Sequence, residues 1–306
     1  MGKPKIGIAL GGGAARGWAH IGVLRALERA GLAPDIVAGT SIGAVAGGCY
    51  VAGRLDELEK FTLSLTKKRV FGFLDFNFAG SGLITGKRLC DELDEYLRPV
   101  LIEDMERKFV AIATEMGTGH EIWLSKGRLV NAMHASYALP GIFRPVNISG
   151  RWLMDGALVN PIPVSVCRAL GARVVIAVNL NSEYFGKGAV VPDQEAHAEP
   201  ELPDENMALP AGNGRAAKRL LHRQFFGRSD GAPGISSVMM DAFNIIQDRI
   251  ARSRLAGDPP DLMISPKLSQ MGLFDFHRGS EAIAAGTAAT EKELDDIQQS
   301  IDTLAA

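Results

Sequence analysis

The sequence predicts an α/β fold in which a mostly parallel central sheet lies between two layers of helices. Three parts of the chain carry this prediction. The apolar run Lys5–Leu10 precedes the amphipathic stretch Trp18–Ala30, and the short run Asp35–Gly39 precedes the uncharged stretch Ile42–Val51. The apolar run Arg173–Leu180 is typical of a fully buried strand. Strands that alternate with helices indicate a three-layer α/β/α domain with a largely parallel sheet.

The remaining elements follow from periodicity and turn residues. The first helix has one broad apolar stripe, formed by Ile21, Val23, Leu24 and Leu27. Gly31 is placed to end that helix, and Ser149-Gly150 predicts the turn of a hairpin. Further strands are expected at Phe109–Thr114, Glu121–Leu124, Trp152–Met154 and Leu262–Ser265. Further helices are expected at Asp56–Thr66, Lys87–Leu97, Leu129–Ala138, Ile235–Arg254 and Arg278–Thr303.

Composition and charge exclude several classes of protein. The chain has 306 residues, 46% of them hydrophobic and 22% charged, which is usual for a globular protein. The formal net charge of −2 gives no support for a nucleic-acid partner. The three cysteines, Cys49, Cys90 and Cys167, are widely spaced, so we expect neither disulfide bridges nor a zinc site. No metal and no cofactor is expected, and the composition leaves the oligomeric state open.

The sequence also predicts where the protein resides. The first ten residues lack the apolar core of a signal peptide. The uncharged run Ile36–Gly53 reaches the lower length limit of a membrane span, but glycine, alanine, Thr40 and Ser41 fill most of it. We therefore expect a cytoplasmic protein without a membrane-spanning helix.

We expect residues 1–306 to form one domain, with residues 234–306 as its C-terminal, mainly helical portion. One segment, 181–233, interrupts the alternation of strands and helices. It is first rich in glycine, proline and acidic residues and then becomes basic. Because loops of this length inside a domain are usually functional or disordered, we expect a flexible insertion or flap.

Gly39-Thr40-Ser41-Ile42-Gly43 matches the pattern G-x-S-x-G. The pattern alone is weak, but here it joins an apolar strand to a buried helix, which is the setting of a nucleophile elbow. Glycine at both ends, Gly39 and Gly43, leaves room for a tight turn. The plain alternative is that Ser41 only caps the following helix.

The stretch Gly11–Gly17, with the sequence GGGAARG, joins the first strand to the first helix. Backbone N–H groups in such a turn suit an oxyanion that forms during acyl transfer, and Arg16 adds positive charge nearby. A dinucleotide fingerprint would need glycine where Arg16 stands, and a phosphate-binding P-loop would need Gly-Lys-Ser/Thr.

Asp155-Gly156-Ala157 follows the predicted strand Trp152–Met154. An aspartate at a strand end, followed by small residues, can reach a serine and accept its proton. The plain alternative is that Asp-Gly only marks a turn.

Together these blocks resemble the patatin-like phospholipase family, especially its short bacterial members. The chain has GGGAARG, GTSIG and DGA in the family's order, with SYALPGIFRPV between the last two. The resemblance covers about Lys5–Asn181, and the later GLFDFHRG is similar to the tail of the bacterial branch. Ala14 stands where many members have glycine, and alanine is tolerated there if its φ is negative.

The resemblance implies a patatin-like fold and a lipid acyl hydrolase with a Ser–Asp dyad. Ser41 would attack an ester of a phospholipid, lysophospholipid or related acyl lipid, and Asp155 would act as general base. Asp155 should be partly desolvated, because an ordinary aspartate is a weak base near neutral pH. Arg16 would support the oxyanion turn. The oxyanion would be held by three backbone amides, those of Gly12, Gly13 and Ala14.

Other functions stay open at this point. His277 follows the last predicted strand and could complete a Ser–Asp–His triad of an α/β-hydrolase, although that fold places its oxyanion loop after a later strand. A non-catalytic acyl-lipid-binding module would need neither Ser41 nor Asp155. A transacylase would use the same acyl-enzyme and pass the acyl group to an alcohol.

The expected partner is an acyl lipid, and the basic half of the 181–233 segment adds an expectation about membranes. If this half is helical, basic and apolar residues form an amphipathic face that suits an anionic membrane surface. The same face could instead pack on the domain or on another subunit. The residues concerned are Arg215, Lys218, Arg219, Leu220, Leu221, Arg223, Phe225, Phe226 and Arg228.

Overall fold

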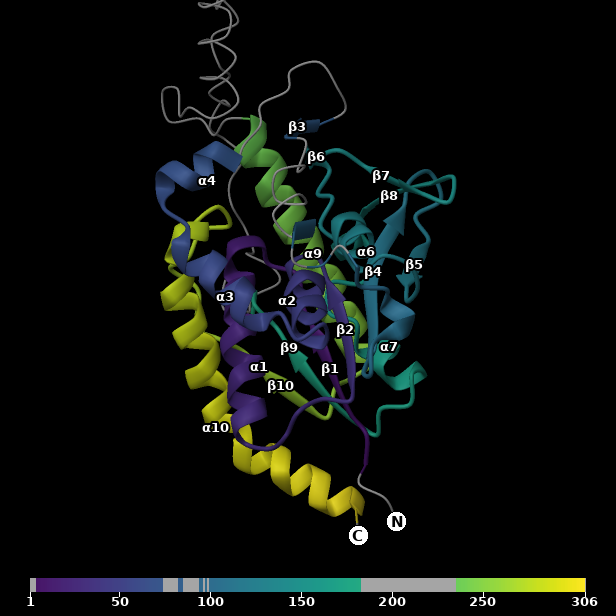
Figure 1. Cartoon of the computed structure of the whole chain (residues 1–306), viewed down its shortest axis with the longest axis vertical. Coiled ribbons are helices and arrows are strands. Elements are labelled where there is room, and N and C mark those ends of the chain that lie inside the picture. The colour runs from purple at the N-terminus through teal and green to yellow at the C-terminus, as the bar shows by residue number, and fades with distance from the viewer. Residues whose placement is uncertain are drawn as a thin grey trace, which may run out of the picture. The chain divides into compact units, whose positions relative to one another are not determined.

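The computed structural model describes residues 4–73, 82–84, 94–95, 97, 99–182 and 235–305. Figure 1 labels its elements. The strands are β1 (Ile6–Leu10), β2 (Ile36–Thr40), β3 (Gly82–Ile84), β4 (Lys108–Glu115), β5 (Glu121–Leu124), β6 (Gly141–Phe143), β7 (Val146–Ile148), β8 (Arg151–Asp155), β9 (Val174–Val178) and β10 (Leu262–Ile264). The α-helices are α1 (Ala19–Arg29), α2 (Ile42–Val51), α3 (Leu55–Ser64), α4 (Lys67–Phe73), α6 (Leu129–Ser136), α7 (Val164–Ala169), α9 (Ile235–Gly257) and α10 (Gly279–Ala305). The 3₁₀-helices are η1 (Ala14–Trp18), η2 (Ile102–Asp104), η3 (Gly156–Leu158) and η4 (Phe276–Arg278).

The central sheet is mostly parallel, which confirms the predicted fold class. Its strands follow the order β10-β9-β1-β2-β4-β8-β7, and β5 pairs with β4 outside this path. The first five strands of that order run parallel, whereas β5, β7 and β8 add antiparallel pairs. β1 lies between β9 and β2, so the Gly-rich turn that follows β1 leaves the middle of the sheet.

Helices cover both faces of this sheet (Figure 1). On one face, Ile8 of β1 belongs to a core that also contains residues of α1, α2 and α10, such as Ile297. On the other face, Ala9 of β1 packs in a second core with Val166 of α7 and Ala251 of α9. Because successive side chains of a strand point to opposite faces, a strand buried on both sides is apolar throughout. The expected three-layer arrangement is confirmed.

β4 sets the positions of β2 and β8. Thr40, at the end of β2, lies opposite Ile112, and Asp155, at the end of β8, lies opposite Ala113. Ala113 also pairs with Ile122 of β5, which therefore occupies the other edge of β4. β2 and β8 thus share one edge of β4, and two neighbouring residues of β4 bring their ends together.

The hairpin predicted at Ser149-Gly150 is confirmed, since both residues have positive φ (52° and 83°) and join β7 to β8. The sequence does not predict α4, α7 or the parallel pair of β3 and β6. Each of these elements has only three to seven residues. Segments so short do not show enough periodicity to be distinguished from loops.

The chain divides into two compact units. One unit comprises Met1–Tyr184 and Asp248–Ala306 and contains the whole central sheet. The other comprises Phe185–Gln247, of which the structure describes only residues 235–247, the first part of α9. The arrangement of residues 1–306 as a single domain stays a prediction.

Some of the features expected from the sequence lie wholly or partly outside the described residues. The insertion expected at 181–233 lies outside the described residues except for Asn181 and Ser182, as do Cys90 and most of the helix expected at Lys87–Leu97. Cys49 and Cys167 are free and buried. No helix within the described ranges is long and apolar enough to cross a membrane.

Candidate active site

Ser41 occupies a sharp turn between β2 and α2. Its φ of 57° and ψ of −125° fall outside the regions that L-residues favour. A Cβ on Gly39 would lie 2.5 Å from the carbonyl oxygen of Gly43, and a Cβ on Gly43 would overlap the carbonyl oxygen of Leu10. Glycine is therefore required at both positions, and the segment has the strand–turn–helix form of a nucleophile elbow.

The hydroxyl of Ser41 does not cap α2. Its Oγ instead donates a hydrogen bond of 2.7 Å to Oδ2 of Asp155. The second carboxylate oxygen, Oδ1, accepts the N–H of Ala157 at 2.8 Å and caps η3. Asp155 therefore has the turn-forming role that Asp-Gly indicates and, with its other oxygen, contacts the serine.

Burial changes the acidity of Asp155. The residue is only 2% exposed, and this desolvation raises the pKa of its carboxyl from 3.8 to about 7, although the hydrogen bonds from Ala157 and Ser41 act in the opposite direction. The expected desolvation of this aspartate is confirmed. A carboxylate with a pKa near neutrality can take a proton from a hydroxyl group and return it.

Ser136, at the end of α6, holds the backbone of the elbow. Its Oγ accepts the N–H of Ser41 at 2.9 Å and donates to the carbonyl oxygen of Ile112 at 2.6 Å. The strained turn is thereby tied to β4, the same strand that positions Asp155. Ser136 is the first residue of SYALPGIFRPV, but no local pattern indicates its role, and only the tertiary contact identifies its partner.

The Gly-rich turn lies beside the elbow. β1 and β2 are parallel neighbours with Leu10 opposite Gly39, so the loops that follow them leave the same edge of the sheet. A Cβ on Gly17 would overlap the side chain of Ile42, just as one on Gly43 would overlap the backbone of Leu10. These close approaches bring the start of α2 against the turn.

The amides of this turn differ in their partners. The N–H of Gly12, which we expected to hold an oxyanion, donates to the carbonyl oxygen of Pro161 at 3.0 Å and is already engaged. Among the described residues, the N–H groups of Gly13 and Ala14 have no acceptor. The condition under which alanine would be tolerated at position 14, a negative φ, is not met, because its φ is 48°. An alanine in this conformation is strained by about 1–2 kcal/mol.

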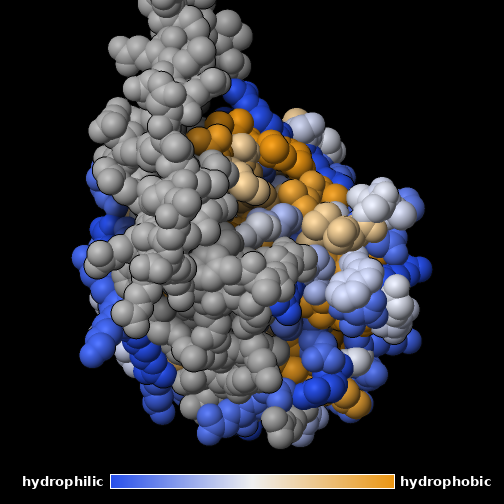
Figure 2. Space-filling model, turned by 90° about the horizontal axis from the view of Figure 1, so that it is seen from above, coloured by the Kyte–Doolittle hydropathy of each residue, from blue (hydrophilic) through white to orange (hydrophobic). Residues whose placement is uncertain are grey.

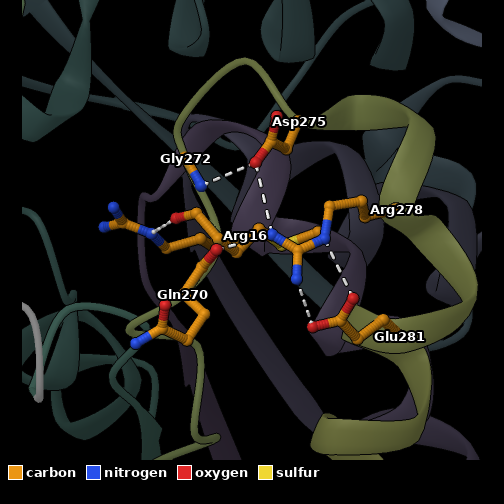
Figure 3. Close-up of polar contacts among 7 residues, drawn as sticks. Arg16, Gln270, Gly272, Asp275, Arg278 and Glu281 are labelled. Carbon is orange, nitrogen blue, oxygen red and sulfur yellow. Dashed lines mark hydrogen bonds and ion pairs between the residues drawn. The ribbon is translucent and has the colours of Figure 1, made fainter.

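Arg16 is 1% exposed and contacts the turn's surroundings rather than the dyad. Its Nε donates to the carbonyl oxygen of Met271 at 2.9 Å, and its Nη1 donates to Oδ1 of Asn181 at 2.7 Å. The amide nitrogen of Asn181 lies 3.4 Å from the carbonyl oxygen of Gly12. Figure 3 shows Arg16 beside the loop that precedes α10. These are contacts of a residue that supports the turn.

None of the histidines that the structure describes contacts the side chain of Ser41 or Asp155 through a hydrogen bond. His20 is buried, its Nε2 lies 2.8 Å from the carbonyl oxygen of Gly11, and desolvation lowers its pKa to about 4. The neutral ring thus donates to the Gly-rich turn. Within the described ranges, the hydrogen bonds of the Ser41 and Asp155 side chains include no histidine, and His277 lies in η4.

The described part of the chain contains no group of three His, Cys, Asp or Glu side chains that could hold a metal ion.

The site brings together four elements of acyl-transfer chemistry: a serine in a strained turn, a buried carboxylate, two amides without acceptors and a supporting arginine. Such a set can activate a hydroxyl group and stabilise negative charge on a substrate oxygen.

Comparisons with known proteins find a matching family and several relatives. The profile described as "Patatin-like phospholipase" matches residues 8–168, which include both Ser41 and Asp155. The NTE family protein Rv1063c of Mycobacterium tuberculosis is 31% identical over 345 residues, covering 99% of this chain and 95% of that protein. Lysophospholipase nte1 of Emericella nidulans is 32% identical over 192 residues, which cover 58% of this chain and 12% of that protein.

Among solved structures, VipD from Legionella pneumophila aligns with a TM-score of 0.47 at 14% identity, covering 96% of this chain and 67% of that one. The family profile spans more than half of the chain, and the identity to Rv1063c extends over almost its whole length. The chain therefore belongs to the patatin-like phospholipase family, whose name implies a hydrolase activity.

Proposed function

We propose that this protein is a serine acyl hydrolase that cleaves carboxylic esters of phospholipids, lysophospholipids or related acyl lipids. The observation that carries the proposal is the 2.7 Å hydrogen bond from Ser41 Oγ to Oδ2 of the buried Asp155. It pairs a nucleophile with a base whose pKa, about 7, suits proton transfer at neutral pH.

In the first step, Ser41 Oγ attacks the carbonyl carbon of the ester. Its proton passes along the existing hydrogen bond to Oδ2 of Asp155. Two hydrogen bonds keep the two side chains in this orientation. The N–H of Ala157 donates to Oδ1 of Asp155, and the N–H of Ser41 donates to Oγ of Ser136. No further residue is needed to carry the proton, so the pair acts as a dyad.

The attack converts the carbonyl oxygen into an oxyanion, which needs donors that are already in place. The amides of Gly13 and Ala14 are the donors of the Gly-rich turn that remain available, because the Gly12 amide is bound to Pro161. Preorganised donors of this kind are worth about 3–4 kcal/mol each in an acyl-transfer site. Arg16 acts through the turn that it supports.

Collapse of the intermediate releases the alcohol, which takes the proton from Asp155 and leaves an acyl group on Ser41. Asp155 then activates a water molecule that hydrolyses this ester and regenerates Ser41. An alcohol that replaced the water would make the same site a transacylase, so the acceptor of the acyl group has to be measured.

Two further observations support an acyl lipid as the substrate. Figure 2 shows hydrophobic residues, in orange, among the described residues of the face that it presents. Acyl chains bind in predominantly apolar surroundings. A relative, nte1, is named a lysophospholipase.

A fluorophosphonate probe tests the nucleophile. We expect the wild type to be labelled and Ser41→Ala not to be, because the probe forms a covalent bond with an activated serine. Ser149→Ala, in the exposed β7–β8 turn, is the matched control and should be labelled like the wild type. Labelling that persists in Ser41→Ala would contradict the proposal.

Release of fatty acid from a panel of phospholipids, lysophospholipids, acylglycerols and nitrophenyl esters tests the substrate class and the base. Asp155→Asn should lower kcat by about 10²–10⁴-fold, the usual contribution of a general base. His277→Ala should retain activity. If His277→Ala is folded and as inactive as Asp155→Asn, a triad replaces the dyad.

A further inference from the structure

We infer that the loop Gln270–Arg278, between β10 and α10, is a clamp that holds the oxyanion turn, and that Arg278 is a positioning residue for catalysis. The inference rests on the proposed function, because it assigns the clamp a role in that reaction. The clamp lies outside residues 8–168, the span that matches the family profile.

Three hydrogen bonds join the turn and η1 to this loop. The N–H of Ala15 donates to the carbonyl oxygen of Leu273 at 3.0 Å, and Nε of Arg16 donates to that of Met271 at 2.9 Å. The indole N–H of Trp18 donates to the carbonyl oxygen of Phe276 at 3.2 Å. Ala15, Arg16, Trp18 and Met271 are all buried. Since buried donors without partners are costly, these bonds fix the turn to the loop.

The loop does not belong to a sheet, and the hydrogen bonds of Arg278 hold its shape instead (Figure 3). Its Nη1 donates to the carbonyl oxygen of Gln270 and lies 3.4 Å from Oδ2 of Asp275. The same Asp275 oxygen accepts the N–H of Gly272 at 2.9 Å. Nε and Nη2 of Arg278 donate to the two carboxylate oxygens of Glu281, at 2.9 and 2.6 Å. One guanidinium thus closes the loop and anchors it to α10.

α10 is a firm anchor because it packs directly on the backbone of α1. A Cβ on Gly22 of α1 would overlap the carbonyl oxygen of Ile283, and a Cβ on Gly286 of α10 would overlap that of Ala19. Such an approach leaves little freedom for α10 to slide. Arg278 thus ties the loop to α10, and the loop in turn binds Arg16 and fixes where the turn lies.

The turn needs this support. Ala14 adopts a strained φ of 48°, and its N–H, with that of Gly13, is proposed to bind the oxyanion. If the clamp loosens, the turn can relax toward an unstrained conformation and the two amides move. A misplacement of about 1 Å can lower a rate by up to about 10²-fold. We therefore expect loss of the clamp to lower kcat more than it raises KM.

Hydrogen exchange tests the clamp independently of activity. Arg278→Gln removes the guanidinium that binds Gln270 and Glu281 but keeps much of the length of the side chain. It should speed exchange of the Ala15 amide by about tenfold, while the amides of β4 stay protected. The matched control is Arg252→Gln, because Arg252 forms a partly exposed ion pair with Asp248 within one helix. Unchanged exchange of Ala15 in Arg278→Gln overturns the inference, whether or not the wild type hydrolyses esters.

Kinetics on a soluble nitrophenyl ester then tests the catalytic role. We expect Arg278→Gln to lower kcat by about tenfold with KM within twofold, and Arg278→Lys to recover part of the loss. The melting temperature should hardly change, since a partly exposed ion pair contributes little stability. The double variant with Arg16→Lys should lose less than the product of the single losses, because both act on one turn. An unchanged kcat, or an equal loss in Arg252→Gln, overturns the role; a wild type inactive on the whole panel contradicts the proposed function instead.

Discussion

Burial raises the pKa of Asp155, which suits proton transfer but lowers the stability of the folded chain at neutral and higher pH. The pKa of its carboxyl is about 7 in the folded chain, against an ordinary value of 3.8. Below about pH 4 the group is protonated in both the folded and the unfolded chain. Between about pH 4 and about pH 7, the folded chain keeps the proton on Asp155 that the unfolded chain has lost. The stability that this proton provides is therefore fully present below about pH 4 and is lost as pH rises through about 7.

Asp155→Asn removes this dependence, since an amide carries no charge at either pH. We expect the variant to show the loss of kcat given above and, at pH 8, to be more stable than the wild type. The gain is at most about 4 kcal/mol, because the pKa difference from 3.8 to about 7 is worth about 1.4 kcal/mol per unit. At pH 4 the gain should vanish. Thermal unfolding at both pH values measures it, and equal melting temperatures at pH 8 would show that burial does not raise this pKa.

At the scale of elements, the contact between α1 and α10 depends on glycine. A Cβ on Gly22 would overlap the carbonyl oxygen of Ile283 and lie 2.7 Å from the backbone nitrogen of Thr287. Gly22→Ala should therefore force the helices apart and lower the free energy of unfolding by about 1–3 kcal/mol. Urea titration measures this loss.

Gly257→Ala provides the control for that substitution. Gly257 ends α9, and a Cβ there would meet no atom within 4 Å. Alanine should be neutral or stabilising by up to about 1 kcal/mol, because it favours the helix. If both variants lost stability equally, the close approach of α1 and α10 would not explain the effect of Gly22→Ala.

At the scale of the whole molecule, a lipid hydrolase has to reach a substrate that is held in a bilayer. The segment around residues 215–228 lies outside the described residues, and its sequence alone places basic residues beside Leu220, Leu221, Phe225 and Phe226. We propose that this segment makes peripheral contact with anionic membranes, where each basic residue near the surface is worth about 1 kcal/mol.

A quadruple variant tests this contact. Replacing Phe225 and Phe226 by Ser, and Arg219 and Arg223 by Gln, should reduce vesicle binding and hydrolysis of anionic vesicles but spare a soluble ester. Arg29→Gln combined with Arg54→Gln controls for the loss of two surface charges. Equal losses on both substrates would indicate a structural role, and unchanged vesicle hydrolysis would exclude the membrane role.

Much of the site could be predicted because its chemistry is local. The elbow is specified by GTSIG, since only glycine fits at Gly39 and Gly43. The strands β1 and β2 beside it are short but wholly apolar and are bounded by turn residues, which is enough to predict them. The short elements α4, α7, β3 and β6 carry too few residues for such a pattern.

The amides of the Gly-rich turn mark the limit of local reasoning. Three glycines and an alanine indicate that N–H groups are close to something negative. Which of them remain available depends on acceptors elsewhere, and Pro161 takes the amide of Gly12. The φ of 48° at Ala14 follows likewise from the surroundings of the turn, because nothing in an alanine prefers it.

The sequence by itself determined the fold class, the serine in its elbow and the aspartate at a strand end, because each depends on a short run of residues. The tertiary structure alone decided how they meet. Ser41 and Asp155 are 114 residues apart, and the register of β4 brings them to 2.7 Å. Arg16 binds a carbonyl oxygen 255 residues away. Such contacts leave no local periodicity, since a backbone carbonyl or a neighbouring strand accepts a partner from any part of the chain that folding brings to it.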